Sequence, residues 1–230
     1  TSFIATISHE LKTPISSIKM SLQLLENKQV GALNTEQRSL LESIEEDAER
    51  LLKITGELLN ITQVESGIIQ MNLMPAQAKE IVENAINANK LAAEQKQIKL
   101  KVAFADNLPK LLADSEKTTW VLTNLISNAI RYSYEHSVID VDVVKDQGKI
   151  KFSVADSGQG IPPEYLDKIF DRYFRIPGTK REGTGLGLSI SKEFIEAQGG
   201  TITVKSNFGE GSIFSITLNS SKENDDKVLP

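Results

Sequence analysis

One histidine motif near the start of the chain is the best candidate for covalent chemistry. His9 is one of only two histidines, and Glu10 and Thr13 follow it closely. On a helix, Thr13 lies one turn beyond His9 on the same face. A neutral imidazole is a nucleophile, and a neighbouring carboxylate can take its proton. The motif therefore suits the making and breaking of a phosphorus–nitrogen bond, provided that a phosphoryl donor binds elsewhere in the chain; an ordinary solvent-exposed histidine is the alternative.

Two long helices must position this motif. Apolar residues of the first recur at steps of three and four: Ile4, Ile7, Leu11, Ile15, Ile18, Leu22 and Leu25. Pro14 is expected to kink this helix just after the histidine. Asn34 and Gln37 have the spacing of a capping box, so a second helix is expected to begin there and to end near Ser66–Gly67.

Each of these helices has one apolar stripe, which a single helical hairpin cannot bury. The simplest solution is a homodimer that forms a four-helix bundle. Packing of the stripes on the rest of the chain is the alternative.

The pattern changes after Met74–Pro75 to shorter helices and alternating strands. We expect helices over 78–95, 114–131 and 187–198, and strands over 98–104, 138–144, 149–155, 201–205 and 212–218. Three helices and five strands, mostly linked by hairpins, predict an α/β sandwich. The expected domains are an all-α helical hairpin over 1–70 and the α/β domain over 71–219, followed by a disordered polar tail over 220–230.

Composition excludes several classes of function. The 230 residues carry a formal net charge of -5, which gives no support to nucleic-acid binding. There is no cysteine, so disulfides and thiolate metal sites are excluded. No apolar run reaches the ~20 residues that span a bilayer, and no signal peptide is visible. Because the chain begins without Met inside an expected helix, we interpret it as a fragment of a longer protein.

A polar face on the helix expected over 114–131 is the first part of a candidate nucleotide site. Asn124, Asn128 and Arg131 are spaced to share that face, and Tyr132 follows them. Amide oxygens can bind Mg²⁺, which favours few protein ligands together with phosphate oxygens. The alternative is a row of core amides that the backbone satisfies.

A glycine-rich turn after the strand 149–155 is the second part. Asp156 at the strand end can accept a hydrogen bond from an exocyclic amine such as that of adenine. Gly158 and Gly160 would let the backbone approach a ring closely, and Ile161 follows them. An ordinary glycine-rich turn is the alternative.

The third part is a run of small residues that leads into the last helix. Gly183, Thr184, Gly185, Leu186 and Gly187 would expose backbone amides to phosphate oxygens. Between these parts lie further candidate residues, namely Phe170, Phe174, Arg175, Lys180 and Arg181. The loop with the two last cations is interpreted as a lid over the γ-phosphate, with a solvated surface loop as the alternative; for the two phenylalanines the alternative is core packing.

In this order the motifs resemble the boxes of the transmitter core of bacterial sensor histidine kinases. The H box corresponds to 3–14, the N box to 124–132, the first glycine box to 156–160, the F box to 170–174 and the second glycine box to 183–187. The resemblance extends over residues 1 to about 218. It implies a dimerisation and phosphotransfer hairpin followed by a catalytic domain of the Bergerat (GHKL) ATP-binding fold.

The resemblance also implies roles for single residues. His9 would be the phosphoacceptor, with Glu10 as the general base. Thr13 would orient water when the phosphorylated regulator is dephosphorylated. Asn128 would bind Mg²⁺, and Asp156 would accept the amine of adenine.

Of two further N-box positions, Asn124 matches the family pattern and Arg131 departs from it. Asn124 corresponds to a further polar position near the metal, and Arg131 stands where the family usually has lysine. An Arg keeps the charge, but its planar fork differs from an ammonium in its phosphate contacts.

The implied function is that of a cytoplasmic protein-histidine kinase, whose parent protein is anchored in the membrane. It would use ATP and Mg²⁺, act as a homodimer, and pass the phosphoryl group to an aspartate of a response regulator, with phosphatase activity toward it. A clamp-type ATPase is disfavoured because its hydrolytic Glu would stand at Asn124. Two further functions compete with the kinase: a non-catalytic scaffold that only binds a regulator, and a core that acts mainly as a phosphatase.

Overall fold

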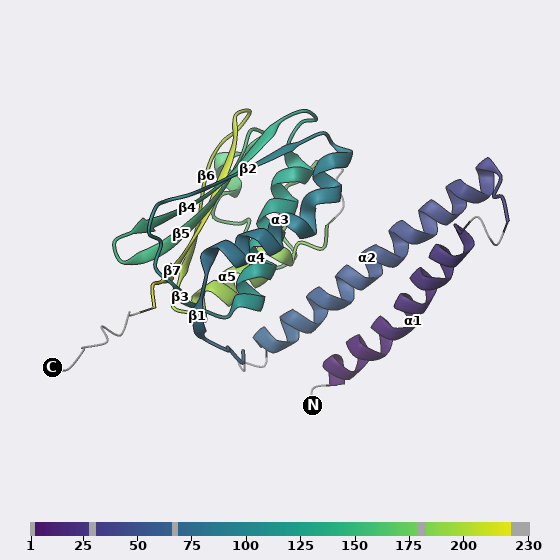
Figure 1. Ribbon diagram of the computed structural model, residues 1–230, viewed down its shortest axis with the longest axis horizontal. Helices are drawn as coiled ribbons and strands as arrows, with labels where there is room; N and C mark the ends of the chain where they lie inside the picture. The colour runs from purple at the N-terminus through teal and green to yellow at the C-terminus, as the bar shows by residue number, and fades with distance from the viewer. Residues whose placement is uncertain (1–2, 28–30, 66–68, 179–182, 222–230) are drawn as a thin grey trace. The chain divides into compact units, whose positions relative to one another are not determined.

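The computed structural model describes residues 3–27, 31–65, 69–178 and 183–221, and the side chains of these except for 3–9 and 62–65. The chain divides into two compact units, Thr1–Ile68 and Ile69–Pro230. The first unit is coloured purple to blue in Figure 1, and the second blue-green to yellow.

The first unit is a hairpin of two long helices, α1 (Phe3–Leu25) and α2 (Thr35–Glu65) (Figure 1). Pro14 lies inside α1 and does not end it. The predicted capping box is confirmed: the Asn34 amide donates to Gln37 Oε1 at 3.0 Å, and the Gln37 amide donates to Asn34 Oδ1 at 2.8 Å. These reciprocal bonds satisfy amides that a helix start leaves unpaired.

The hairpin buries only part of its apolar stripe. Ile15, Leu22 and Ala48 are buried within the unit. Among the described side chains of the two helices, nine large apolar ones remain exposed: Leu11, Ile18, Met20, Leu24, Leu25, Leu40, Ile44, Leu51 and Ile54. An exposed apolar surface of this extent on one helical hairpin is typical of an interaction surface.

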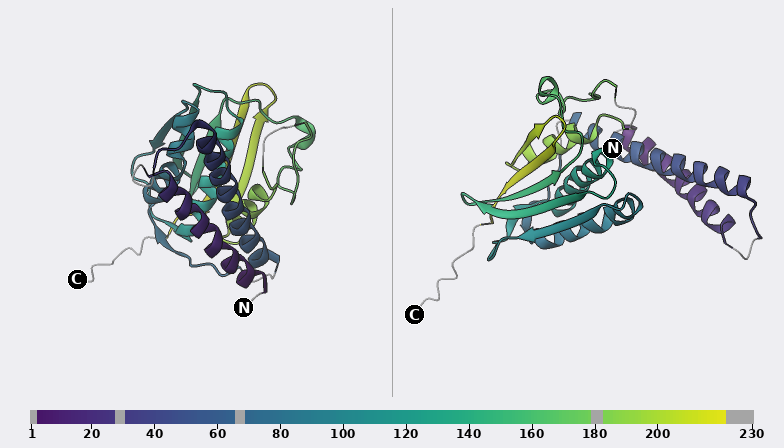
Figure 2. Two further views of the ribbon diagram at one scale, coloured as in Figure 1. Left: turned by 90° about the vertical axis from the view of Figure 1, so that its right-hand side faces the viewer. Right: turned by 90° about the horizontal axis from the view of Figure 1, so that it is seen from above.

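The second unit is a five-stranded sheet with three helices on one face (Figures 1 and 2). The strands lie in the order β2 (Lys99–Phe104), β4 (Val138–Asp146), β5 (Lys149–Asp156), β7 (Gly211–Asn219), β6 (Thr201–Asn207). Only β2 and β4 run parallel; the other neighbours are antiparallel. The helices are α3 (Ala78–Gln95), α4 (Ser115–Tyr132) and α5 (Gly187–Glu196). The predicted helical region followed by an α/β layer fold is therefore confirmed.

The core of this unit lies between the sheet and the helices. In β4, Ile139, Val141 and Val143 are fully buried, whereas Asp140 and Asp142 between them are exposed. This alternation follows from the two-residue period of a strand, of which one face is covered. The β4–β5 connection is the predicted hairpin turn, with left-handed φ values of 48° at Gln147 and 80° at Gly148.

Three features of this unit differ from the expectation. A two-stranded sheet pairs β1 (Met74–Ala76) with β3 (Leu111–Ala113), and a short 3₁₀ helix, η1, spans Pro163–Tyr165. Asn219 belongs to β7 and Ser220 bridges to Leu111, so backbone pairing continues into the segment expected as a disordered tail; residues 222–230 lie outside the described part. Within the described residues, no helix is long and apolar enough to cross a membrane.

Candidate active site

Asn124 joins α4 to the start of α5. Its Nδ2 donates to Ser191 Oγ at 3.1 Å, and a Cβ on Gly187 would lie 2.5 Å from its Oδ1. Gly187 therefore allows the two helices to approach closely at this amide. The Asn124 amide thus has one hydrogen-bond partner within the protein, the Ser191 hydroxyl, and its contact with a metal or nucleotide stays a prediction.

Asn128 and Arg131 lie farther along α4. Asn128 is half-buried, and its side chain has no hydrogen bond to any residue that the structure describes. Arg131 is also half-buried, and one of its terminal nitrogens lies 3.2 Å from the place of a Cβ on Gly183. The C-terminal half of α4 thus presents an available amide and a cation beside the second glycine box.

Asp156, at the end of β5, begins the first glycine loop. Its Oδ1 accepts a hydrogen bond from the Gly158 amide at 2.9 Å. Burial raises the pKa of this carboxyl above its ordinary value, against hydrogen bonds from the amides of Gly158 and Ser212, which lower it. A carboxylate that is partly desolvated forms stronger hydrogen bonds with a donor that enters the site.

The glycines of this loop make room for the protein's own backbone. A Cβ on Gly158 would lie 2.4 Å from the carbonyl oxygen of Tyr132, the last residue of α4. Gly160 has φ 66°, and a Cβ there would lie 2.1 Å from the carbonyl oxygen of Asn207. Glycine is therefore required at both positions for close packing of the loop on α4 and on the β6–β7 turn, and the approach of these glycines to a ligand ring stays a prediction.

Ile161 ends the loop in a buried position, with its amide bonded to Ser206 Oγ at 2.8 Å. It anchors the loop to β6.

The F box packs beside the sheet and the η1 segment. Phe170 meets Phe214 edge-on, with ring centroids 6.5 Å apart, and Phe174 lies 5.8 Å from Tyr165. Both phenylalanines are half-buried, and the Lys192 ammonium also lies 6.0 Å from the Phe170 ring centroid, so a nucleotide role for either ring stays a prediction. Arg175 is exposed.

A backbone hydrogen bond joins Tyr173 of the F box to the second glycine box. The Tyr173 amide donates to the Gly185 carbonyl at 2.9 Å, and both residues are left-handed, with φ values of 63° and 74°. A Cβ on Gly185 would lie 2.7 Å from the Tyr173 carbonyl carbon. A left-handed aromatic residue is uncommon, and such strain concentrates at functional sites.

The second glycine box leads into α5 without a side-chain cap. Leu186 is the N-cap residue, and its amide donates to Thr184 Oγ1 at 3.3 Å. Since no side chain in the described part caps this helix start, its first amides are available to an anion. Lys180 and Arg181 of the expected lid lie outside the described residues.

On the helical hairpin, the backbone at His9 is helical, and its side chain lies outside the described part. Glu10 and Thr13 are exposed on α1. No group of three or more His, Cys, Asp or Glu side chains in the described residues could hold a metal ion.

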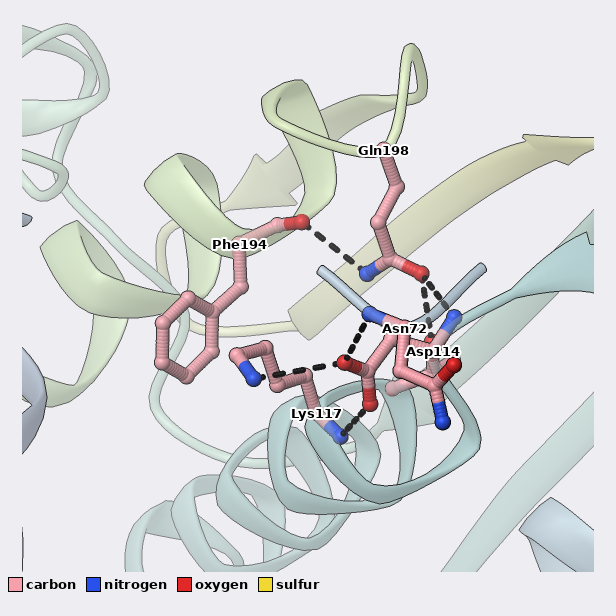
Figure 3. A network of polar contacts seen from close by, with 6 residues as sticks. Asn72, Asp114, Lys117, Phe194 and Gln198 are labelled. Atoms are coloured by element: carbon pink, nitrogen blue, oxygen red, sulfur yellow. Dashed lines mark hydrogen bonds and ion pairs between the residues drawn. The ribbon is translucent and has the colours of Figure 1, made fainter. Parts of the chain in front are cut away.

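A polar network at the other end of α4 was not predicted from the sequence (Figure 3). Asp114 caps the helix: its Oδ1 accepts from the Lys117 amide at 3.0 Å, and its Oδ2 accepts from the Asn72 amide at 3.1 Å. Burial alone would raise its pKa, but these bonds and the Lys117 ammonium together lower it. Gln198 completes the network, accepting from the Asp114 amide at 2.8 Å and donating to the Phe194 carbonyl at 2.9 Å.

The structure thus gathers motifs that are distant in the sequence around one helix. Three residues of α4 each lie close to a glycine of these motifs: Asn124 to Gly187, Arg131 to Gly183, and the Tyr132 carbonyl to Gly158. In each pair, a Cβ on the glycine would lie within 3.2 Å of the helix residue. The arrangement can hold a ligand with an amine at one end and phosphates at the other.

Comparison with known proteins supports this interpretation in both units. Residues 1–67 match the family described as the His Kinase A (phospho-acceptor) domain. Residues 113–222 match the family of histidine kinase-, DNA gyrase B-, and HSP90-like ATPases.

Curated relatives and solved structures agree. Sensor histidine kinase WalK of Bacillus subtilis is 33% identical over 238 residues, covering 97% of this chain and 37% of WalK. Aerobic respiration control sensor protein ArcB of Escherichia coli is 35% identical over 225 residues, covering 95% and 28%. The crystal structure of full-length ShkA in complex with AMPPNP is 28% identical with a TM-score of 0.77, covering 95% of this chain and 45% of ShkA.

The chain spans less than half the length of the curated relatives it matches. Over nearly all of its own length, however, the chain matches these relatives through both units. The chain therefore belongs to the sensor histidine kinases, a family of protein-histidine kinases in which a phospho-acceptor region is followed by an ATP-binding domain.

Proposed function

We propose that this chain phosphorylates His9 with the γ-phosphate of ATP and passes the phosphoryl group to an aspartate of a response regulator. The observation that carries the proposal is the gathering of the Asp156 carboxylate, the Asn128 amide and the uncapped start of α5 around the C-terminal half of α4. The domains of this proposal are 1–70 for dimerisation and phosphotransfer and 71–219 for catalysis.

The proposed nucleotide contacts follow from the chemistry of each group. The Asp156 carboxylate accepts the adenine amine, and Ile161 supplies an apolar wall. The amides at 183–187 and the Arg131 guanidinium take the phosphates. Lys180 and Arg181 of the proposed lid would meet the γ-phosphate, and Phe170, Phe174 and Arg175 are the remaining candidate residues of the nucleotide site.

Asn128 would hold Mg²⁺ through its amide oxygen, together with phosphate oxygens of the nucleotide. The fit rests on its half-buried side chain, which has no hydrogen bond to a described residue, and on the preference of Mg²⁺ for few protein ligands. When bound, the ion neutralises negative charge on the transferred phosphoryl group.

In the proposed reaction, one imidazole nitrogen of His9 attacks the γ-phosphorus in line. A nitrogen–phosphorus bond forms, the bond from the γ-phosphorus to the bridging oxygen breaks, and ADP leaves with that oxygen. Glu10 receives the proton of the other imidazole nitrogen, which keeps the phosphorylated ring neutral. Thr13 orients a water molecule when the phosphorylated regulator is hydrolysed.

The proposed assembly is a homodimer through α1 and α2. The nine exposed apolar side chains of the hairpin support it, because a second copy would bury them in a four-helix bundle. The regulator would then dock on the bundle below His9, and the reaction would take place in the cytoplasm.

The test is incubation of the chain with γ-labelled ATP and Mg²⁺, alongside the variant His9→Gln. We expect an acid-labile, base-stable label on the wild type and none on the variant, with ATP binding equal in the two. A label that persists in His9→Gln would exclude His9 as the acceptor.

A second variant tests the nucleotide contact. Asp156→Asn removes the charge that accepts the adenine amine and is expected to weaken ATP binding about 100-fold, as loss of a charged hydrogen bond of about 3 kcal/mol would do. Titration calorimetry measures it. An unchanged dissociation constant would remove Asp156 from the adenine pocket.

A further inference from the structure

Lys96 closes the C-terminal end of α4 from outside the helix. It is the residue that directly follows α3, and its Nζ donates to the carbonyl oxygens of Ile130 at 2.8 Å, Arg131 at 2.9 Å and Ser133 at 3.4 Å. The last carbonyls of a helix lack partners within it and carry the negative end of its dipole. One ammonium therefore satisfies three acceptors and fixes the turn that contains them.

Lys96 is itself held by the segment that it fixes. The His136 amide donates to the Lys96 carbonyl at 3.2 Å, and the Lys99 amide donates to the Ser137 carbonyl at 3.0 Å. The half-buried lysine is thus bound at its backbone and at its ammonium to the same stretch of chain.

The opposite side of this turn supports the loop of Asp156. The Tyr132 carbonyl touches the backbone of Gly158, where a Cβ would lie only 2.4 Å away. The Gly158 amide in turn donates to Asp156 Oδ1 at 2.9 Å. A movement of the turn would therefore move Gly158 and the carboxylate that it orients.

Ser133, which ends this turn, adds no side-chain hydrogen bond to its closure. Ser133 is fully buried, and its Oγ is the only buried side-chain polar atom of the described residues without a hydrogen bond. The Ser133 amide bonds to the Ala129 carbonyl at 3.0 Å, but its hydroxyl adds nothing to the closure. The side-chain hydrogen bonds to the Ile130, Arg131 and Ser133 carbonyls that hold the turn thus come from Lys96.

We propose that Lys96 is a positioning residue of the nucleotide site, which sets the place of Asp156 and Arg131 through the last turn of α4. This inference rests on the proposed function, in which Asp156 accepts a hydrogen bond from the adenine amine. Without Lys96, the dissociation constant of ATP rises about tenfold, as expected for lost hydrogen bonds to a charged donor. The preference for ATP over GTP falls with it, whereas the rate of phosphorylation at saturating ATP is kept.

The experiment compares Lys96→Met with the matched control Lys101→Met in the whole chain. Lys101 is exposed on β2. Calorimetry gives the dissociation constants of ATP and GTP, and labelled ATP gives the rate against nucleotide concentration. Lys96→Arg, which keeps a cationic donor, is expected to restore part of the affinity. Trp120, the single tryptophan, lies on α4 with its ring 5.6 Å from that of Phe194, so its emission reports on whether the helix is folded.

The outcomes separate the inference from the proposed function. If the wild type binds no ATP, the proposed function fails. If the wild type binds ATP and folded Lys96→Met binds it equally well with the same ATP preference, the inference fails. If Lys96→Met does not fold, Lys96→Gln takes its place; this uncharged side chain is too short to reach all three carbonyls, and wild-type affinity in it would again overturn the inference.

Discussion

A carboxylate lies near each end of α4, and the pKa values of the two carboxylates are shifted in opposite directions. At the N-terminal end, Asp114 receives two amides and an ammonium, and its pKa is lowered. Near the C-terminal end, Asp156 is partly desolvated with few donors, and its pKa is raised. A carboxylate that the fold fully satisfies serves stability, whereas one that the fold leaves under-satisfied is ready to bind a ligand.

The largest effect is expected from substitution of Gly158, which packs against the C-terminal end of α4. In Gly158→Ala the new Cβ would meet the Tyr132 carbonyl at 2.4 Å, so the loop or the helix end must move, at a cost of about 3 kcal/mol. We expect a large loss of ATP affinity by calorimetry. The control Gly56→Ala on α2, whose Cβ would meet nothing within 4 Å, should bind ATP as the wild type does; equal behaviour of the two variants would contradict the packing role of Gly158.

Removal of the Asp114 cap at the N-terminal end of α4 should lower stability without lowering ATP affinity. Asp114→Ala loses the helix cap and the hydrogen bond to the Asn72 amide, and should lower the free energy of unfolding by about 2 kcal/mol. ATP affinity well below the melting temperature should remain, because the nucleotide groups lie at the far end of α4. Denaturant unfolding followed by Trp120 emission measures the first quantity. A parallel loss of affinity would mean that the two ends are coupled.

The contributions of Asp114 and Asp156 to stability should depend on pH in opposite directions. Since the pKa of Asp114 is lowered on folding, its stabilisation is present above the ordinary value of 3.8 and is lost as the pH falls through the lowered pKa. The raised pKa of Asp156 has the opposite sign: its contribution to stability declines as the pH rises from 3.8 through the raised pKa.

The binding consequence of this shift is measurable. The ionised form of Asp156 accepts the adenine amine, so ATP affinity should fall as the pH drops through the raised pKa, before the fold loses the contribution of Asp114. Asp156→Asn should lack this part of the pH profile. A wild-type profile in that variant would assign the titration to another group.

A smaller effect on stability is expected from removal of the Lys117 ammonium. Its ammonium lies 3.2 Å from Asp114 Oδ2, but in Lys117→Met the backbone cap remains, so the loss should be about 0.5–1 kcal/mol. Lys192→Met, which removes an exposed pair with Glu196, should cost about 0.3 kcal/mol. Thermal unfolding of the two variants gives the comparison; a larger loss for Lys192→Met would show that burial of the Asp114 pair has no influence.

Local signals predicted much of the fold. The helix expected over 78–95 has those bounds, and the Asn34–Gln37 capping box and the turn at Gln147–Gly148 are as expected. The sheet of β1 and β3 was missed because each strand has three residues and its partner lies nearly forty residues away. No local pattern marks so short a pair.

The sequence predicted the positions of some candidate site residues in the fold, but not their contacts. The spacing of Asn124, Asn128 and Arg131 did place them on one helix. The partners of Gly158 and Gly160 could not be foreseen, because they come from α4 and from the β6–β7 turn. Lys96 carried no signal, since it is one of 26 basic residues, and only the folded chain brings the three carbonyls to it.

The closure of α4 also bears on the order of folding. Lys96 reaches its carbonyls across 34 to 37 residues, whereas Gln198 reaches Asp114 across 84. Because a longer loop costs more entropy to close, the Lys96 end should form early, together with α3 and β4, and the Gln198 end only after α5 has docked. The start of α4 would then be the last part of the helix to become rigid, and mutations there should mainly speed unfolding.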